Sequence, residues 1–170
     1  HGNISWRKTF GGNEVDAFQD IEEAINGDVY VLGTTSSSIP GQHGESDIWI
    51  VKLNAMGGQI WQKAFGGSSS ELARDLFPTI DGGFLIAGTT SSNNGNVSGN
   101  HGGTDGWIFK IDRRGEMKWQ KTYGGTNTDI LNAITAKPDG SFAAGGWSYS
   151  TDGGFGNKGK ADLWVISDRK

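Results

Sequence analysis

The sequence predicts an all-β fold of repeated sheets, and three observations support this prediction. One phrase occurs three times, as ISWRKTFGG at 4–12, QIWQKAFGG at 59–67 and MKWQKTYGG at 117–125. A fixed repeat of this kind dictates the architecture of a chain. Asn-Gly or Asp-Gly pairs, which suit two-residue hairpin turns, lie between apolar runs at 26–27, 81–82 and 139–140. No segment shows the sustained 3.6-residue period of a helix.

The spacing of the repeats predicts one domain over residues 1–170. The tryptophans of the repeated phrase, Trp6, Trp61 and Trp119, are 55 and 58 residues apart, and the step from Trp119 through the C-terminus back to Trp6 is 57 residues. We therefore expect an integral number of repeats with no further domain. Their approximate bounds are 13–67, 68–125, and 126–170 together with 1–12.

Each repeat contains four short segments with strand character, which in the second copy are 73–80, 83–90, 106–111 and 118–125. The middle segments are apolar at every position, as in VYVL at 29–32, IWIV at 48–51, FLIA at 84–87 and LWVI at 163–166. A strand with one face in water alternates, whereas a continuous apolar run implies cover on both faces. The inner strands of a propeller lie between neighbouring blades and meet this condition. The pattern favours β-propeller blades, three four-stranded repeats per chain, over a three-sheet β-prism or a trefoil-like monomer.

A family resemblance points the same way. The pattern W-x-K-x-[FY]-G-G, D-G-G-F-L-I-A-G-T-T-S-S and D-x-W-[IV]-x-K-[IL] resembles the tandem repeats of large Bacteroidota surface and secreted proteins, which are generally taken to be β-propeller blades. The segment KIDRRGEMKW at 110–119 is similar to the tryptophan-docking turn of quinoprotein propellers. The resemblance implies a propeller fold and an extracellular or cell-surface location. The third copy departs from the pattern, because Ser167 replaces the strand lysine and GGWSYS at 145–150 replaces GTTSS.

Three blades are too few for a ring, since propellers typically have four to eight. The segment 4–10 has the sequence of an outer strand, but it precedes the first complete repeat, and the last repeat ends after 162–167 without an outer strand. We expect a homodimer that exchanges this strand and completes a six-bladed ring. The chain is alternatively a fragment or an engineered piece of a larger propeller.

Composition excludes several partners. The net charge is −4 without a basic stripe, which argues against nucleic acid or an anionic membrane as the main partner. No apolar run approaches the length of a transmembrane segment and no signal peptide is present, so we expect no membrane insertion. The absence of cysteine excludes disulfides and thiol chemistry.

Carboxylates recur at two fixed positions of the repeat. Asp47, Asp105 and Asp162 lie two residues before a strand tryptophan, and Asp16, Glu71 and Asp129 lie four residues after a Gly-Gly pair. A catalytic acid–base pair needs two carboxylates in one pocket, whereas residues repeated in every blade are spread around the ring. We expect these carboxylates to accept hydrogen bonds from turn amides. No nucleophile motif, phosphate loop or zinc spacing is present, so the prediction is a protein without catalytic activity and without a cofactor.

The long loops at 34–46, 89–104 and 147–161 are the predicted ligand surface. Each joins the second strand of a repeat to the third, so all should emerge on one rim, where a rigid scaffold aims binding residues. They are rich in Asn, Ser, Thr and Gly, and the third adds three aromatic residues including Phe155. Amides and hydroxyls beside an aromatic platform suit a sugar. The candidate ligand residues are Trp147, Tyr149, Asp152, Asn94, Asn96, Asn100, His101 and His43.

Other interpretations of the loops stay open. Asn and Gly also shape long turns without binding anything. Metal binding is not expected, because His43 and His101 occupy equivalent loops a blade apart with Lys158 in the third, and Asp152 is the one carboxylate of its loop. The leading hypothesis is a non-catalytic, lectin-like extracellular module that binds glycan, by analogy with small lectins that assemble into propellers. The alternatives are a structural or adhesion module of a surface protein, and an enzyme that uses a central tunnel.

Overall fold

The computed structural model describes residues 2–154 and 156–168, which form three antiparallel sheets without a helix. This confirms the predicted all-β class and the three-sheet organisation. The first sheet contains β1 (Asp16–Glu23), β2 (Val29–Thr35), β3 (Asp47–Leu53) and β4 (Gln59–Phe65). The second contains β5 (Glu71–Pro78), β6 (Phe84–Thr90), β7 (Asp105–Ile111) and β8 (Met117–Tyr123). The third contains β9 (Asp129–Ala136), β10 (Phe142–Ser148) and β11 (Asp162–Ser167).

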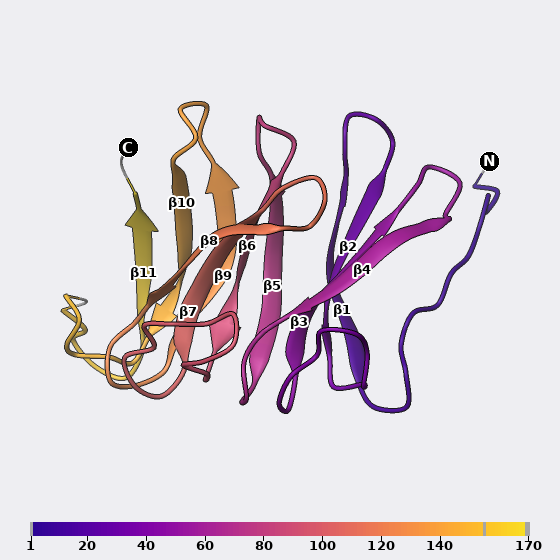
Figure 1. Cartoon of the computed structure of the whole chain (residues 1–170). Helices are drawn as coiled ribbons and strands as arrows, with labels where there is room; N and C mark the ends of the chain where they lie inside the picture. The colour runs from indigo at the N-terminus through magenta and orange to yellow at the C-terminus, as the bar shows by residue number, and fades with distance from the viewer. Residues whose placement is uncertain (1, 155, 169–170) are drawn as a thin grey trace.

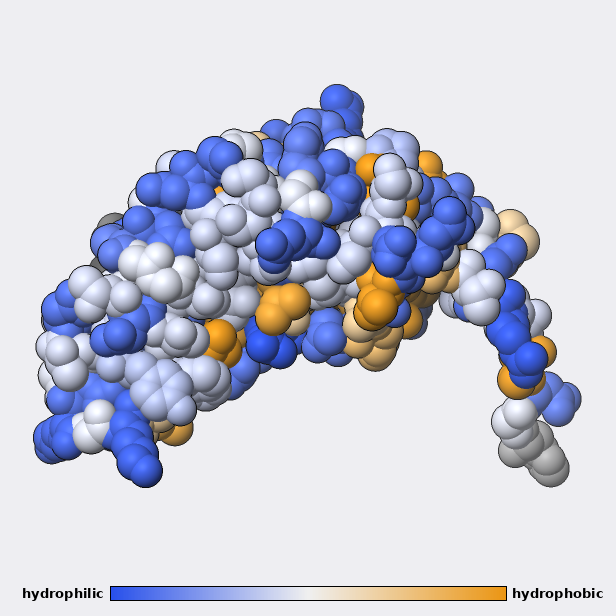
Figure 2. Space-filling model, turned by 90° about the horizontal axis from the view of Figure 1, so that it is seen from below, coloured by the Kyte–Doolittle hydropathy of each residue, from blue (hydrophilic) through white to orange (hydrophobic). Residues whose placement is uncertain are grey.

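The sheets are up-and-down meanders that stand face to face in chain order (Figure 1). The termini lie at opposite ends of the row, and the molecule has the form of an open arc (Figure 2). None of the described residues belongs to a helix, so this part of the chain holds no helix that could cross a membrane.

The expected hairpins form, but not with two-residue turns. Gly27, Gly82 and Gly140 have φ values of 82°, 77° and 83°, whereas every described residue other than glycine, including Asn26, has a negative φ. A two-residue type I′ turn needs a positive φ at both central positions. Here the amide of Gly27 instead donates to the carbonyl of Ala24 at 2.8 Å, and the connection is longer. Glycine is therefore needed at one position of each turn.

The first strand of the second repeat begins and ends two residues earlier than predicted, at 71–78 instead of 73–80. It starts at Glu71, which pairs with Thr90 across the sheet and accepts a hydrogen bond from its hydroxyl at 2.6 Å. It ends at Pro78, which has no amide hydrogen to continue a ladder.

Two apolar cores lie between the sheets. Tyr30, Leu32, Ile48 and Ile50 of the first sheet pack against the second, and Leu85, Ala87 and Ile108 of the second pack against the third. Every residue of β6 is buried, because this strand has a sheet on each side. The prediction that inner strands are covered on both faces is therefore confirmed for the second sheet.

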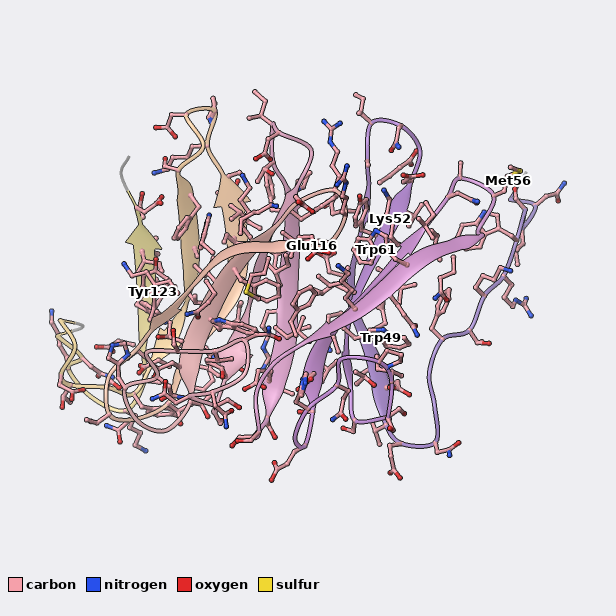
Figure 3. All side chains as sticks on the ribbon, in the orientation of Figure 1. Trp49, Lys52, Met56, Trp61, Glu116 and Tyr123 are labelled. Carbon is pink, nitrogen blue, oxygen red and sulfur yellow. The ribbon has the colours of Figure 1, made fainter. Side chains whose placement is uncertain are left out.

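Trp61 of the first sheet and Trp6 of the N-terminal segment each dock on a turn that contains a glycine. A β-carbon at Gly115, in the turn after β7, would lie only 3.0 Å from Cη2 of Trp61 on β4. A β-carbon at Gly57, in the turn after β3, would likewise lie 2.7 Å from Cδ2 of Trp6. Glu116, beside the docked Trp61 in Figure 3, forms an ion pair with Lys63 of β4. Glycine at these turns leaves room for an indole.

Residues 2–15 belong to no strand in the single chain. The expectation that residues 4–10 form the outer strand of a partner copy stays a prediction. At the other end of the arc, β11 pairs with β10 and has no strand on its outer edge among the described residues. The third repeat thus has three strands instead of four.

We predict that Gly115→Ala lowers the free energy of unfolding by about 2 kcal/mol or more, because it adds a clash with Trp61 to the strain of a positive φ. Thermal unfolding measures this loss. Gly154→Ala is the matched control, since Gly154 also has a positive φ but nothing lies near its β-carbon. Equal losses in the two variants would contradict tryptophan docking as the reason for glycine.

Candidate functional site

The three long loops emerge at one edge of the arc, the lower edge in Figure 1. Each connects the second strand of a sheet to the third, so the alternating strand directions bring all of them to the same side. The predicted common rim is therefore present. Two sets of carboxylate contacts hold its loops, and the asparagines of the second loop add further hydrogen bonds.

The first set is a carboxylate at the start of each third strand. Asp47 Oδ2 accepts the amide of His43 at 2.7 Å, Asp105 Oδ2 accepts the amide of His101 at 2.9 Å, and Asp162 Oδ2 accepts the amide of Lys158 at 2.7 Å. Each bond closes the end of a loop over four residues. The predicted structural role of these aspartates is confirmed.

The second set anchors the Gly-Gly corners that precede each first strand. The carboxylates of Asp16, Glu71 and Asp129 accept the amides of Gly12, Gly67 and Gly125 at 2.9, 2.7 and 2.7 Å. They also accept hydroxyl hydrogen bonds from the end of the second strand or from the loop that follows it. This role of turn anchoring is the predicted one.

Carboxylates of neighbouring sheets meet at the Gly-Gly corners. A β-carbon at Gly66 would lie 2.3 Å from Asp47 Oδ1 and 2.4 Å from Glu71 Oε2. Asp105 and Asp129 flank Gly124 in the same way. Within the described residues, Asp47 Oδ1 is buried and has no hydrogen-bond partner. Burial raises the pKa of Asp47 to about 6, and the charge of Glu71 adds to the effect.

The asparagines of the second loop are used by the fold. Asn94 Oδ1 accepts the amide of Ser68 at 2.8 Å, and Asn96 exchanges two hydrogen bonds with the backbone of Gly66 at 2.9 and 3.2 Å. Both therefore reach from the second sheet to the corner between β4 and β5. Asn100 bridges within its own loop, donating to the carbonyl of Thr90 at 3.3 Å. Sequence reasoning missed the contacts between repeats, because no local pattern reveals which corner a loop will touch.

The third loop offers the aromatic surface. Trp147 and Tyr149 meet edge to face with ring centroids 5.2 Å apart. Tyr149 is 46 % exposed, while Trp147 is half-buried on β10. Phe155, the further aromatic residue of this loop, lies outside the described residues.

Asp152 takes the place of Asn94 in the third loop. Its Oδ1 accepts the amide of Thr126 at 2.9 Å, and this hydrogen bond lowers the pKa of the Asp152 carboxyl. The nearby His101 ring contacts the buried Asp105, with Nδ1 2.7 Å from Oδ2. His43 lies in the first loop, away from this group. The structure thus brings Trp147 at the end of β10 into contact with Tyr149, places Asp152 further along the same connection, and leaves His43 in the loop of the first sheet.

No metal site is apparent in the described part of the chain. Each exposed histidine ring faces the aspartate that closes its own loop. No group of three or more His, Asp or Glu side chains in residues 2–154 and 156–168 could hold a metal ion.

The fold and the rim define a class: an all-β repeat protein whose face-packed sheets present polar loops on one edge. No protein-family model matches the chain. The chain is similar to the regulatory protein FlaEY of Caulobacter vibrioides, with 26% identity over 140 residues. The match covers 74% of this chain and 15% of FlaEY, so the chain spans a small part of that protein's length.

We predict that Asp47→Asn stabilises the protein, relative to wild type, increasingly as pH rises from about 4 to about 7. The folded-state pKa of Asp47 is raised to about 6 from 3.8, so the wild type loses stability as this carboxyl ionises. Melting temperatures across this pH range measure the difference. Asp112→Asn is the control, because the pKa of Asp112 is lowered to about 2 and its contribution is lost only below pH 4. Parallel pH profiles for wild type and Asp47→Asn would contradict the prediction.

Proposed function

We propose that the chain is a non-catalytic extracellular binding module made of β-propeller blades, with the loop rim as its ligand surface and glycan as its ligand class. The observation that carries this proposal is the third loop, where the exposed Tyr149 contacts the half-buried Trp147 edge to face and the carboxylate of Asp152 is anchored on the amide of Thr126. The extracellular location rests on the resemblance of the repeats to those of surface and secreted proteins.

The chemistry of the third loop suits a sugar. The exposed ring of Tyr149 offers a flat apolar surface for the face of a pyranose, and Trp147 holds that ring from the side. Asp152 remains ionised because its pKa is lowered, and an ionised carboxylate can accept hydrogen bonds from sugar hydroxyls. The repeated carboxylates are unsuitable for catalysis, since Asp47, Glu71, Asp105 and Asp129 are buried and hold backbone amides.

The propeller is the finer part of the proposal. Face-to-face sheets in an open arc support propeller blades, because a three-sheet prism or a trefoil would bring the first and third sheets together. Two such arcs, with three sheets each, would make a six-bladed ring. The ring would then present six loops on one rim, three from each chain. The part-length match to FlaEY supports the alternative that these repeats form a segment of a larger protein.

A structural or adhesion module without a small ligand is the second candidate. It is favoured by the hydrogen bonds that already occupy Asn94, Asn96 and Asn100. Under this hypothesis the loops stabilise contacts between blades, and the rim binds a protein or nothing.

We predict that Tyr149→Ala weakens glycan binding about fivefold, because the loss of one aromatic stacking contact removes on the order of 1 kcal/mol. A glycan array identifies the ligand, and calorimetry compares the variants. Tyr149→Phe, which keeps the ring, should bind nearly as wild type does. The absence of binding to any sugar at millimolar concentration would contradict the proposal and favour the structural module.

A further inference from the structure

Both ends of the arc expose apolar side chains. Phe18 and Ile21 on the outer face of the first sheet are 61 % and 51 % exposed. Leu163 and Val165 on the outer face of the third sheet are 81 % and 67 % exposed. A repeat array that ends in water needs polar faces on its terminal repeats, and neither end of this chain has one.

The same repeat positions are buried inside the arc. Ala73 and Leu76 of the second sheet correspond to Phe18 and Ile21 and are almost fully buried by the first sheet. Ile50 and Ile108, which both correspond to Val165, are completely buried by the following sheet. The end faces therefore have the side chains of a sheet-to-sheet contact but lack the partner.

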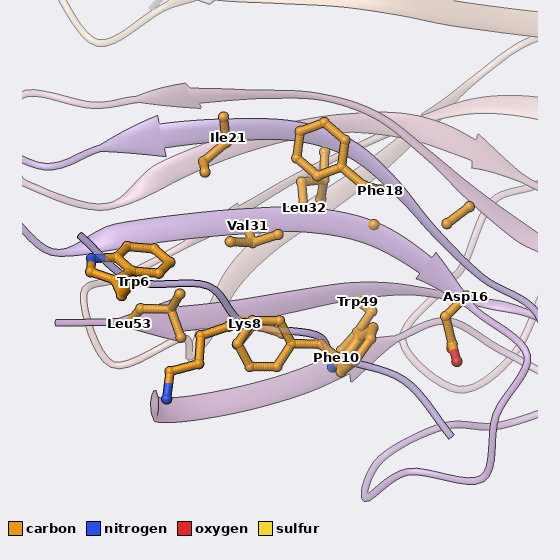
Figure 4. A pocket seen from close by; sticks show the side chains of 13 residues that line it. Trp6, Lys8, Phe10, Asp16, Phe18, Ile21, Val31, Leu32, Trp49 and Leu53 are labelled. Carbon is orange, nitrogen blue, oxygen red and sulfur yellow. The ribbon is translucent and has the colours of Figure 1, made fainter. Parts of the chain in front are cut away.

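A groove of about 300 Å³ marks the place of the missing partner at the first sheet (Figure 4). Its lining is mostly apolar and includes Trp6, Phe10, Phe18, Ile21, Val31 and Leu53. The corresponding face of the second sheet receives Ile48 and Ile50. By the same repeat geometry, the groove has the position to receive Leu163 and Val165 of another copy.

The N-terminal segment makes the tryptophan contact of an outer strand, although it pairs with no sheet. Trp6 lies on the turn at Gly57 as Trp61 lies on the turn at Gly115. Phe10, four residues further on, meets Trp49 of the first sheet edge to face, with ring centroids 6.5 Å apart. The segment therefore has the docking contacts of β4 but no strand beside it.

The third sheet has the complementary gap. Two open clefts of about 540 and 410 Å³ adjoin β11, and Lys121, Tyr123, Val165 and Ile166 line both of them. In the first two sheets a fourth strand occupies the edge next to the third strand. The clefts leave the edge of β11 accessible to such a strand.

We propose that two copies of this chain bind head to tail, with residues 4–10 of each forming the fourth strand on β11 of the other. This inference rests on the propeller assembly of the proposed function, but not on glycan binding. The pairs Ile50–Lys63 and Ile108–Lys121 fix the register within the chain. The equivalent pair between copies is Val165 with Lys8 of the partner subunit. Leu163 and Val165 of one copy then fill the groove on the first sheet of the other copy, and residues 4–10 of that other copy pair with β11.

The contact between copies is weaker than the contacts inside a chain. Asp20 Oδ2 accepts the amide of Leu76 at 2.9 Å, and Asp75 Oδ2 accepts the amide of Ile134 at 2.6 Å, so each carboxylate binds the next sheet. Ala133 occupies this repeat position in the third sheet and accepts nothing through its side chain. The dimer should therefore dissociate in dilute solution before the sheets of one chain separate.

Light scattering on a sizing column tests the assembly. We expect a wild-type mass of about twice 18.1 kDa at micromolar concentration. Leu163→Asp should shift it to the monomer, because a carboxylate cannot enter the groove without losing its hydration. Ile80→Asp is the matched control, since Ile80 is 87 % exposed on a hairpin turn away from both ends, and it should leave the dimer intact. A wild-type monomer, or a dimer that survives Leu163→Asp, would overturn the proposal.

Disulfide trapping tests the register. The chain has no cysteine, so mixing the single variants Val165→Cys and Lys8→Cys reports only contacts between copies. Directly opposed residues of antiparallel strands have β-carbons about 4.5–5.5 Å apart, and small adjustments allow a disulfide. We expect a mixed disulfide from this pair and none from Val165→Cys with Arg7→Cys, whose side chain points to the opposite face. A reversed preference would overturn the strand exchange. A dimer that binds no sugar would contradict glycan binding alone.

Discussion

Every inner strand of this protein is apolar on both faces, and the rest of the structure depends on this constraint. A sheet with two dry faces cannot end in water, so each one requires a neighbour on each side. The second sheet has both neighbours within the chain, and β6 is fully buried as a result. The first and third sheets have one each, which leaves Phe18 at one end and Leu163 at the other exposed. Burial of the apolar faces is therefore complete for the second sheet and incomplete at the two ends of the arc.

Hydrogen bonds of the repeated carboxylates hold the loops and corners between the packed sheets. The carboxylates of Asp47 and Glu71 accept hydrogen bonds from amides at a loop end and at a corner, where no neighbouring strand can accept them. Because residue 66 is a glycine, the two carboxylates can lie close to each other at this corner. Burying two acids side by side raises the pKa of Asp47 to about 6. Loop anchoring is therefore obtained at a cost in stability above that pH. This anchoring makes the rim rigid, because loops held at both ends present their remaining side chains in fixed positions.

The predicted site was only partly recoverable from local patterns. Trp147 and Tyr149 were identified because they depart from the repeat, and the structure places them together. Asn94 and Asn96 were chosen for their chemistry, yet their amides bind the corner of the neighbouring repeat. Composition describes what a loop can offer a ligand, but it does not reveal which groups the fold has already used.

The repeat, the apolar runs and the turn residues were sufficient to predict the three-sheet organisation and the aspartates that close the loops, since these depend on neighbours a few residues apart. The length of the turns and the exact ends of the strands differ from the prediction. Periodicity could not show that residues 4–10 lie outside any strand in the single chain. Their sequence is that of an outer strand, but a strand exists only where another backbone supplies hydrogen bonds, and the chain's own free edge at β11 lies at the far end of the arc. Contacts between sheets set the angle of that arc and so keep the two ends apart.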